Sequence, residues 1–333
     1  MDKKVKNIFR YCFWTAVAVV LVYFCLRSVD WAQFADALRQ CRWEWIVVSI
    51  LLGAAGLAFR GLRWRRLLLP IDPSTSFVTC FNAYNICCAA NLVVPRAGEV
   101  IRIGYVMRHS DKDAEGRRLV GFDNCLGTVA MERGFDFLLV FVLAVVMVWV
   151  EADRFGAWLT SSLKVPQSSV WIGLGVFTLV NIGLVFLLRK LRNRGGFWTK
   201  SWRFVAGLFS GFTSFAHMKH GWLFLLYSVI IWVLHWLTSA CIVWALQDIP
   251  MFSSLTLADA FLIMLVGSMS TAIPVPGGFG AYHGAVAAAL LGIWNIPMGM
   301  GMIFATLNHE SQVLANALCG IASYIHESFF RKK

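Results

Sequence analysis

Apolar stretches of about 20 residues recur along the whole of this 333-residue chain. A helix needs about that length to cross the hydrocarbon core of a bilayer, because each residue adds about 1.5 Å. Apolar residues make up 59% of the sequence and charged residues 14%, against roughly 45–50% and 25% in soluble domains. These features exclude a soluble enzyme, a disordered chain and a coiled coil. They predict an all-α polytopic membrane protein.

Six of the stretches are predicted to cross the membrane as single helices. They are residues 8–26, 45–59, 122–150, 170–188, 221–246 and 298–325. Two shorter segments, residues 31–44 and 201–217, carry apolar side chains at helical spacing. That pattern fits helices that lie flat at the membrane surface.

Two further apolar segments are interrupted by proline and glycine, which break helices. Residues 77–109 are interrupted at Pro95-Arg96-Ala97-Gly98-Glu99, and residues 255–293 at Pro274-Val275-Pro276-Gly277-Gly278-Phe279-Gly280. The arm after the first interruption, residues 100–107, is too short to cross about 30 Å. The sequence therefore predicts two re-entrant helical hairpins whose turns lie within the membrane.

The two halves of the chain, residues 8–150 and 170–325, carry these elements in the same order. Pro95 and Pro274 are 179 residues apart, and Glu132 and Glu310 are 178 apart. Three crossings in each half, an odd number, would invert one half relative to the other. We expect one integral membrane domain over residues 1–333, built from inverted repeats, an architecture typical of transporters.

The net charge of +12 has an explanation in the membrane. With the N-terminus in the cytoplasm, 22 of the 30 Lys and Arg residues fall on the cytoplasmic side, five outside and three within the membrane. This bias follows the positive-inside rule, so the charge does not indicate a nucleic-acid partner. We expect a bacterial cytoplasmic (inner) membrane protein with both termini in the cytoplasm.

Charged residues inside membrane segments are costly and are commonly functional. Those in the first half are Arg96, Glu99, Arg102, Glu132, Arg133 and Asp136. Glu99 and Arg102 are three apart on one helix face and are able to pair. Arginine is well suited to holding a phosphate, which favours a midplane site for an anionic head group. A structural ion-pair cluster that locks the hairpins together is the alternative.

In the second half, the glycine turn and the polar residues near it form the other part of the predicted site. Gly277, Gly278 and Gly280 would let backbone approach a ligand, and a helix starting near Ala281 would aim its amides at the turn. A hinge that only reverses the chain is the alternative. The titratable residues near this turn are His283, His309 and Glu310. We expect the histidines to contact a proton or a head group.

No sequence motif indicates a cofactor. The nine cysteines show no C-x-x-C or Cys/His ligand spacing, and no nucleotide-binding, hydrolase or zinc-protease motif occurs. We therefore expect no cofactor, no metal and no catalytic residue.

Three motifs, in this order, resemble the lysylphosphatidylglycerol synthase transmembrane family. They are Pro95-Arg96-Ala97-Gly98-Glu99-Val100-Ile101-Arg102, Glu132-Arg133 with Asp136, and Pro276-Gly277-Gly278-Phe279-Gly280. The resemblance implies a flippase-like bundle with two re-entrant hairpins around a lipid-accessible cavity. It also implies that Arg96, Glu99, Arg102, Glu132 and Arg133 line that cavity.

Two departures from the family pattern bear on function. His283 stands where the family usually has an acid, which would alter charge preference or proton coupling. The cytoplasmic aminoacyltransferase domain of the full-length synthase is absent, so the resemblance implies a stand-alone transporter rather than a transferase.

Three functions follow from these features. The first is a flippase-like transporter that moves an anionic or aminoacylated phospholipid, or a polyprenyl-linked lipid, between leaflets. The second is an intramembrane enzyme acting on a lipid phosphate, with His283 or His309 as its reactive group. The third is a membrane partner of a separate lipid-modifying enzyme.

Overall fold

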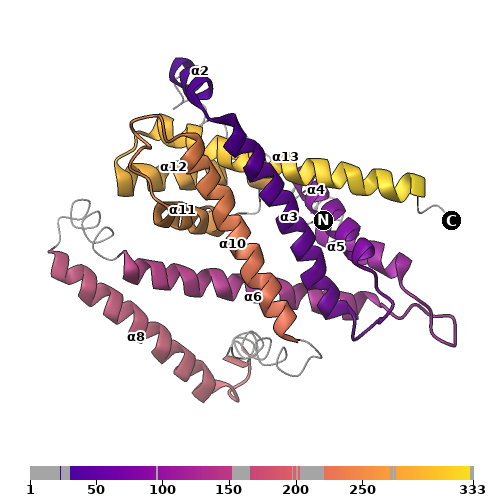
Figure 1. Ribbon diagram of the computed structural model, residues 1–333. Coiled ribbons are helices and arrows are strands. Elements are labelled where there is room, and N and C mark those ends of the chain that lie inside the picture. Colours follow the sequence, from indigo (N-terminus) through magenta and orange to yellow (C-terminus); the bar gives the residue numbers. More distant parts are fainter. Residues whose placement is uncertain are drawn as a thin grey trace, which may run out of the picture. The chain divides into compact units, whose positions relative to one another are not determined.

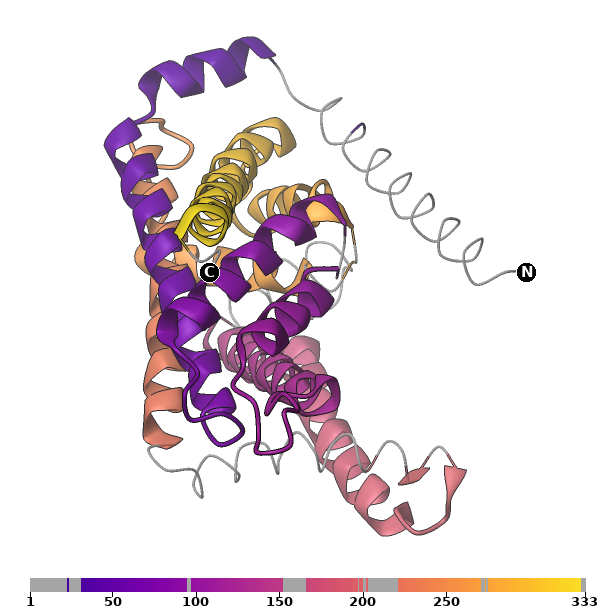
Figure 2. The same ribbon diagram turned by 90° about the vertical axis from the view of Figure 1, so that its right-hand side faces the viewer.

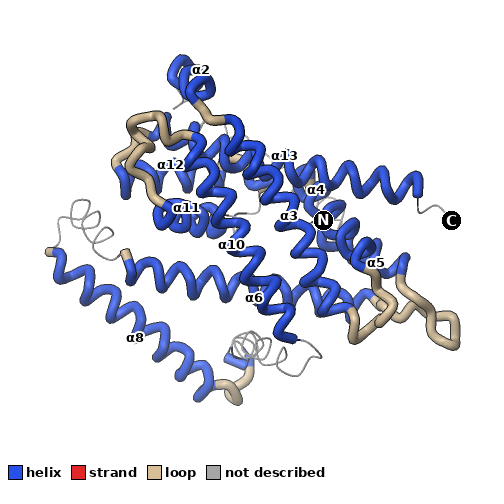
Figure 3. The backbone as a smooth tube through the Cα atoms, in the orientation of Figure 1, coloured by secondary structure: helices blue, strands red, loops and turns tan. Residues whose placement is uncertain are grey.

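The fold is helical throughout the described part of the chain (Figures 1 and 3). The computed structural model describes residues 23, 31–94, 97–151, 166–196, 198–199, 202, 221–270, 273 and 275–330. Within these residues the β pairing is one isolated bridge between Lys112 and Arg118. The all-α class predicted from the sequence is therefore confirmed. The predicted helices at 8–26 and 201–217 lie outside the described residues, apart from Tyr23 and Trp202.

The chain divides into two compact units, residues Met1–Val129 with Leu223–Lys333, and residues Ala130–Trp222. The larger unit contains most of the helices. They are α2 (Trp31–Gln40), α3 (Trp43–Leu68), α4 (Phe77–Val93), α5 (Ala97–His109), the start of α6 (Phe122–Val150), α10 (Gly221–Ala245), α11 (Leu257–Ser270), the 3-10 turn η1 (Pro276–Gly278), α12 (Ala281–Trp294) and α13 (Met298–Phe330). The smaller unit holds the rest of α6 and α8 (Gln167–Leu191).

Two helices of the described chain, α3 and α10, are each long and apolar enough to cross a membrane. They pack side by side and antiparallel in the larger unit (Figures 1 and 2). The rings of Trp45 and Trp244 lie 4.7 Å apart near one end, and those of Phe59 and Tyr227 lie 6.0 Å apart toward the other. This pair forms one wall of the larger unit.

The predicted breaks in the two hairpin segments are confirmed. The first segment folds as α4 and α5, separated by residues 94–96, and the second as α11 and α12, separated by residues 271–280 that include η1. The first arms, α4 and α11, are short apolar helices of 17 and 14 residues. At about 1.5 Å per residue neither spans a 30 Å core.

The longest helix, α13, packs against α3, α4 and α12. Small residues allow close approach at each contact, as is common between membrane helices. Gly301 lies against Ala287 of α12, and Gly320 lies against Ala89 of α4. Hydrogen bonds from the Gln312 amide to the Ser49 backbone and hydroxyl join α13 to α3. The α13 helix therefore connects the first half of the chain to the second.

Polar contacts join loops at opposite ends of α3. At its start, Arg42 makes two hydrogen bonds, of 2.6 and 2.5 Å, to the Asp248 carboxylate beyond the end of α10. Past its end, the buried Asp72 carboxylate accepts hydrogen bonds from Ser110 and Asp111 beyond α5. Each loop pair is thereby held at its own end of the α3 helix.

Three of the described helices, α3, α8 and α13, extend beyond their predicted bounds. The α3 helix was expected to end at Phe59 and continues to Leu68 through the arginine-rich segment, and α13 continues past Ile325 to Phe330. Arginine is a good helix former whose aliphatic stem covers apolar surface, so the end of an apolar run need not end the helix. The predicted span at residues 122–150 matches α6.

The main described elements of the smaller unit are two apolar helices, the Ala130–Val150 part of α6 and α8. The rings of Trp149, near the end of α6, and Trp171, near the start of α8, lie 5.9 Å apart. Large apolar side chains such as Phe137 and Leu179 are exposed. Such surfaces are expected where lipid surrounds a helix.

Candidate functional site

The two broken hairpins touch at their interruptions. The last turn of α4 contacts η1, and Leu92 lies beside Gly277. Discontinuous helices of this kind form binding sites in many membrane transporters. The candidate site is therefore the region around the contact between the two tips.

The turn of the second hairpin depends on glycine. Gly277, Gly278 and Gly280 have φ angles of 58°, 79° and 78°. These angles lie in the left-handed region, which side chains with a Cβ rarely adopt. The turn leads directly into α12 at Ala281, as the sequence predicted.

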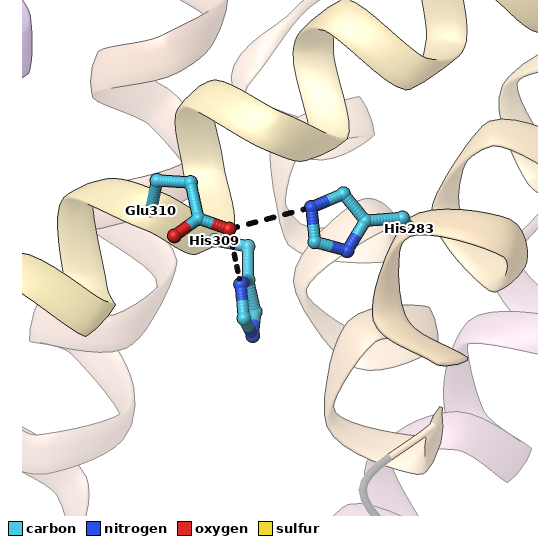
Figure 4. A group of neighbouring side chains, drawn as sticks. All are labelled: His283, His309 and Glu310. Atoms are coloured by element: carbon cyan, nitrogen blue, oxygen red, sulfur yellow. Dashed lines mark hydrogen bonds and ion pairs between the residues drawn. The ribbon is translucent and has the colours of Figure 1, made fainter. Parts of the chain in front are cut away.

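Next to this turn lie His283, His309 and Glu310, which we call the His–Glu cluster (Figure 4). His283 comes from the first turn of α12, and the other two come from the middle of α13. The Glu310 Oε1 atom lies 3.1 Å from His309 Nδ1 and 3.5 Å from His283 Nε2. The structure thus gathers the predicted site residues of the second half into one place.

A hydrogen bond ties the cluster to the glycine turn. The Nε2 atom of His309 lies 2.9 Å from the Gly277 carbonyl oxygen. A carbonyl can only accept, so the His309 ring donates through Nε2. The α13 helix therefore holds the tip of the second hairpin through this side chain.

The aromatic rings of Phe279 and Tyr282 pack against one side of the cluster. The Phe279 ring is stacked on His283 at 6.4 Å and meets His309 edge-on at 5.1 Å. Tyr282 lies 5.0 Å from His309 and accepts a 2.8 Å hydrogen bond from the Asn308 amide. His283 and His309 are only 7% and 9% exposed, whereas the Glu310 side chain is 40% exposed. The cluster is therefore enclosed by rings and open along Glu310.

Arg102 occupies a different environment. Its guanidinium lies over the rings of Trp64, at 4.6 Å, and Tyr84, at 5.0 Å, and the side chain is fully buried. Cation–π contacts of this kind stabilise a desolvated guanidinium. A head group would reach Arg102 only if the surrounding helices separated.

Glu99 lies at the tip of the first hairpin. Its carboxylate accepts a 3.3 Å hydrogen bond from the amide of Asn91, and the Asn91 carbonyl accepts from the Gly98 amide at 2.8 Å. Asn91 thus bridges α4 and α5 beside Glu99.

The other predicted site residues fall elsewhere. Glu132, Arg133 and Asp136 lie on the part of α6 that belongs to the smaller unit. Arg96 lies outside the described residues. That these four share a cavity with Arg102 stays a prediction.

Sequence reasoning missed the neighbours that shape these sites. Asn91, Trp64 and Tyr84 flank the first hairpin, and Phe279 and Tyr282 flank the cluster. A polar Asn near the end of an apolar helix is a recognisable signal. Aromatic residues in a membrane protein are too common to single out.

The chain was compared with known proteins. A family profile described as the lysylphosphatidylglycerol synthase TM region matches residues 13–320. No curated protein matched, and no solved structure matched. The match covers nearly the whole sequence and contains both hairpins, so the chain is an integral membrane protein with a lipid-related role. It belongs to the lysylphosphatidylglycerol synthase TM region family.

Proposed function

We propose that this protein moves an anionic lipid between the two leaflets of the bacterial inner membrane, as a flippase-like transporter. The observation that carries the proposal is the contact between the tips of the two broken hairpins. In a lipid-related membrane family, such a meeting point offers polar groups at a depth where a head group must cross.

The second hairpin provides groups suited to a phosphate. Its glycine turn exposes backbone, and the α12 helix directs its first amides and positive dipole end toward that turn. The cluster histidines add donors when protonated. We propose that the head group, anionic or aminoacylated, contacts this turn during transfer.

The first hairpin provides the opposite part of the path. Arg102 is buried against Trp64 and Tyr84, which supports a transport cycle with a closed arrangement in which the arginine is shielded from lipid. Separation of α4 and α5 from α3 would expose the guanidinium to a phosphate. Alternating between these arrangements is the proposed transport step, with Glu99, Glu132 and Arg133 as further polar groups along the path.

Lipid exchange in reconstituted vesicles tests the proposal. Vesicles carry fluorescent phosphatidylglycerol, its lysyl derivative or a labelled polyprenyl phosphate, and a membrane-impermeant quencher reports the outward-facing fraction. We expect faster exchange than in empty vesicles for at least one anionic lipid. We expect Arg102→Gln to slow that exchange.

A charge-matched control separates a local effect from a loss of positive charge. Arg39→Gln removes an exposed arginine that pairs along its own helix, with Asp36 at 3.3 Å, and should leave exchange unchanged. Size-exclusion profiles establish that both variants are folded. Parent protein that exchanges none of the lipids above the rate of empty vesicles would refute the proposal.

An intramembrane phosphatase is the second candidate, favoured by the facing rings of His283 and His309, whose centroids are 4.9 Å apart. One histidine would attack or activate water while the other protonated the leaving group. Release of phosphate from a polyprenyl diphosphate, lost in His283→Ala, would support this function over transport.

A partner of a separate lipid-modifying enzyme is the third candidate. It predicts co-purification with that enzyme and no exchange or phosphate release by the protein alone.

A further inference from the structure

The three donor atoms of the His–Glu cluster converge on one point from two helices. One ligand atom from each of His283, His309 and Glu310 lies within 4.8 Å of the other two (Figure 4). Both ring nitrogens face the same oxygen, Glu310 Oε1, at 3.1 and 3.5 Å. Two helices that meet elsewhere through small apolar residues here bring together two imidazoles and an acid.

The tautomer of His309 requires a positive species between its ring and Glu310. Its Nε2 atom donates to the Gly277 carbonyl, so a neutral ring presents the Nδ1 lone pair to the Glu310 oxygen at 3.1 Å. Two lone pairs at that distance repel. The contact is favourable only if a positive species lies between them, either a proton or a metal ion.

His283 brings a second ring nitrogen to the same point. Its Nε2 atom faces the same Glu310 oxygen from a second helix, where it either donates a proton of its own or ligates the ion that His309 contacts. The other nitrogen of His283, Nδ1, is buried and has no hydrogen-bond partner among the described residues. The ring lies parallel to that of Phe279, with Nε2 on the side of Glu310.

We propose that the His–Glu cluster binds one Zn²⁺ ion through His283 Nε2, His309 Nδ1 and Glu310. Tetrahedral zinc with bonds of about 2.0–2.2 Å places its ligand atoms roughly 3.3 Å apart. The two distances to Glu310 Oε1, 3.1 and 3.5 Å, lie close to this value, and the ligand atoms of the three residues all lie within 4.8 Å of one another. Nitrogen ligands select zinc over magnesium or calcium, which prefer oxygen.

The surroundings supply two further features of a zinc site. The hydrogen bond from His309 Nε2 to a backbone carbonyl is the outer contact that fixes a ligating histidine in most metal sites. Three protein ligands come together here among the described residues, and the Glu310 side is open. Two neutral histidines and one carboxylate leave the ion with a charge of about +1, so the fourth position suits water or a phosphate oxygen.

Direct metal binding to the full chain tests the site. The protein is purified in detergent with an affinity tag that lacks histidine, stripped with a chelator and titrated with ZnCl₂ in a calorimeter. We expect one Zn²⁺ per chain, with elemental analysis after gel filtration as a check. Co²⁺ in its place should give the visible absorption of a four- or five-coordinate site with nitrogen and oxygen ligands.

Single substitutions assign the ligands. His283→Ala, His309→Ala and Glu310→Gln should each weaken Zn²⁺ binding by more than the roughly 10–100-fold expected on losing an outer partner. The matched control is His235→Ala, which removes a histidine of α10 whose ring faces Ser268 at 3.4 Å, and it should bind Zn²⁺ as the parent does. Zn²⁺ should also raise the thermal unfolding midpoint of the parent and of the His235→Ala control, but not that of the three cluster variants.

Parent protein that binds no Zn²⁺ would overturn the proposal. Retention of full affinity in all three cluster variants would overturn it as well. If those variants do not fold, X-ray absorption at the zinc edge of the loaded parent decides the matter. Two imidazoles and an oxygen support the site, and a spectrum without imidazole overturns it.

Discussion

Gly98 is the residue on which the close packing of α4 and α5 depends. A Cβ at this position would overlap the Cys87 carbonyl oxygen and crowd the Asn91 side chain. Neither neighbour can move far, because one is helix backbone and the other holds the Gly98 amide. The first hairpin therefore requires glycine at its tip for space rather than for conformation.

We expect Gly98→Ala to destabilise the protein by about 1–3 kcal/mol, the usual cost of overpacking. Gly104→Ala on the same helix is the control, because a Cβ there meets nothing within 4 Å. Thermal unfolding in detergent compares the two variants. Equal midpoints would show that α4 and α5 are not held this closely.

Outside the predicted membrane segments, Asp72 is the residue that holds the loop after α3 to the loop after α5. Its buried carboxylate accepts four hydrogen bonds, from the amide and hydroxyl of Ser74, the hydroxyl of Ser110 and the amide of Asp111. Burial alone would raise the pKa of this carboxyl, but the hydrogen bonds outweigh it and hold the pKa below the usual value.

This lowered pKa gives Asp72→Asn a pH-dependent effect. The ionised carboxylate stabilises the fold at pH values above its unfolded-state pKa of about 3.9. That stabilisation is lost as the pH falls through the lower folded-state pKa. At pH 7 the free energy of unfolding of the variant should be lower by about 1–3 kcal/mol, because the NH₂ group of the new amide faces hydrogen-bond donors instead of accepting from them. Unfolding midpoints of variant and parent should converge in acid. The neighbouring Asp111→Asn changes an exposed side chain, so its unfolding midpoint should equal that of the parent already at pH 7.

At the scale of elements, the antiparallel contact of α4 with α13 joins the two halves of the chain. The Asn85 amide donates to the Ser323 hydroxyl at 2.9 Å, and Asn82 lies 3.0 Å from the His326 ring. Hydrogen bonds of this kind hold membrane helices in register where apolar packing does not favour protein over lipid.

Cross-linking tests this register. With the native cysteines replaced by alanine, Asn85→Cys combined with Ser323→Cys should react rapidly with a short bifunctional thiol reagent. Asn85→Cys combined with Tyr324→Cys should not, because Tyr324 is exposed on another face of α13. Mass spectrometry of the linked peptides gives the yields. Comparable yields from both pairs would contradict the packing.

The elements themselves were largely predictable. Apolar runs located α6 and α10 closely, and Pro–Gly runs located both helix breaks, because these signals are local. The contact of Leu92 with Gly277 and the meeting of His283 with Glu310 were not predictable. Those partners come from separate helices, and residue spacing along the chain gives no ligand motif for the cluster.

At the scale of the whole molecule, the loop contacts of the larger unit agree with the orientation predicted from charge. The Arg42–Asp248 pair joins two segments predicted to lie outside, and the Asp72–Ser110 bond joins two predicted to lie in the cytoplasm. The positive-inside rule sets the direction.

Cysteine labelling tests that direction. In a background without native cysteines, Ser253→Cys between α10 and α11 should react with a membrane-impermeant maleimide in intact cells. Lys112→Cys between α5 and α6 should react only after permeabilisation. The reverse pattern would show that the protein is inserted the other way round.

The hydrogen bond between His309 and the Gly277 carbonyl has a thermodynamic consequence. One ring contacts the cluster through Nδ1 and the hairpin tip through Nε2, so an ion at the first position and a ligand at the second share a side chain. Linkage requires that each change the affinity of the other by the same factor. A lipid head group that draws the turn away from α13 without touching the ion would weaken zinc binding, and added zinc would weaken the binding of that head group by the same factor. A head group whose phosphate oxygen takes the fourth zinc position would have the opposite effect, and each would strengthen the other.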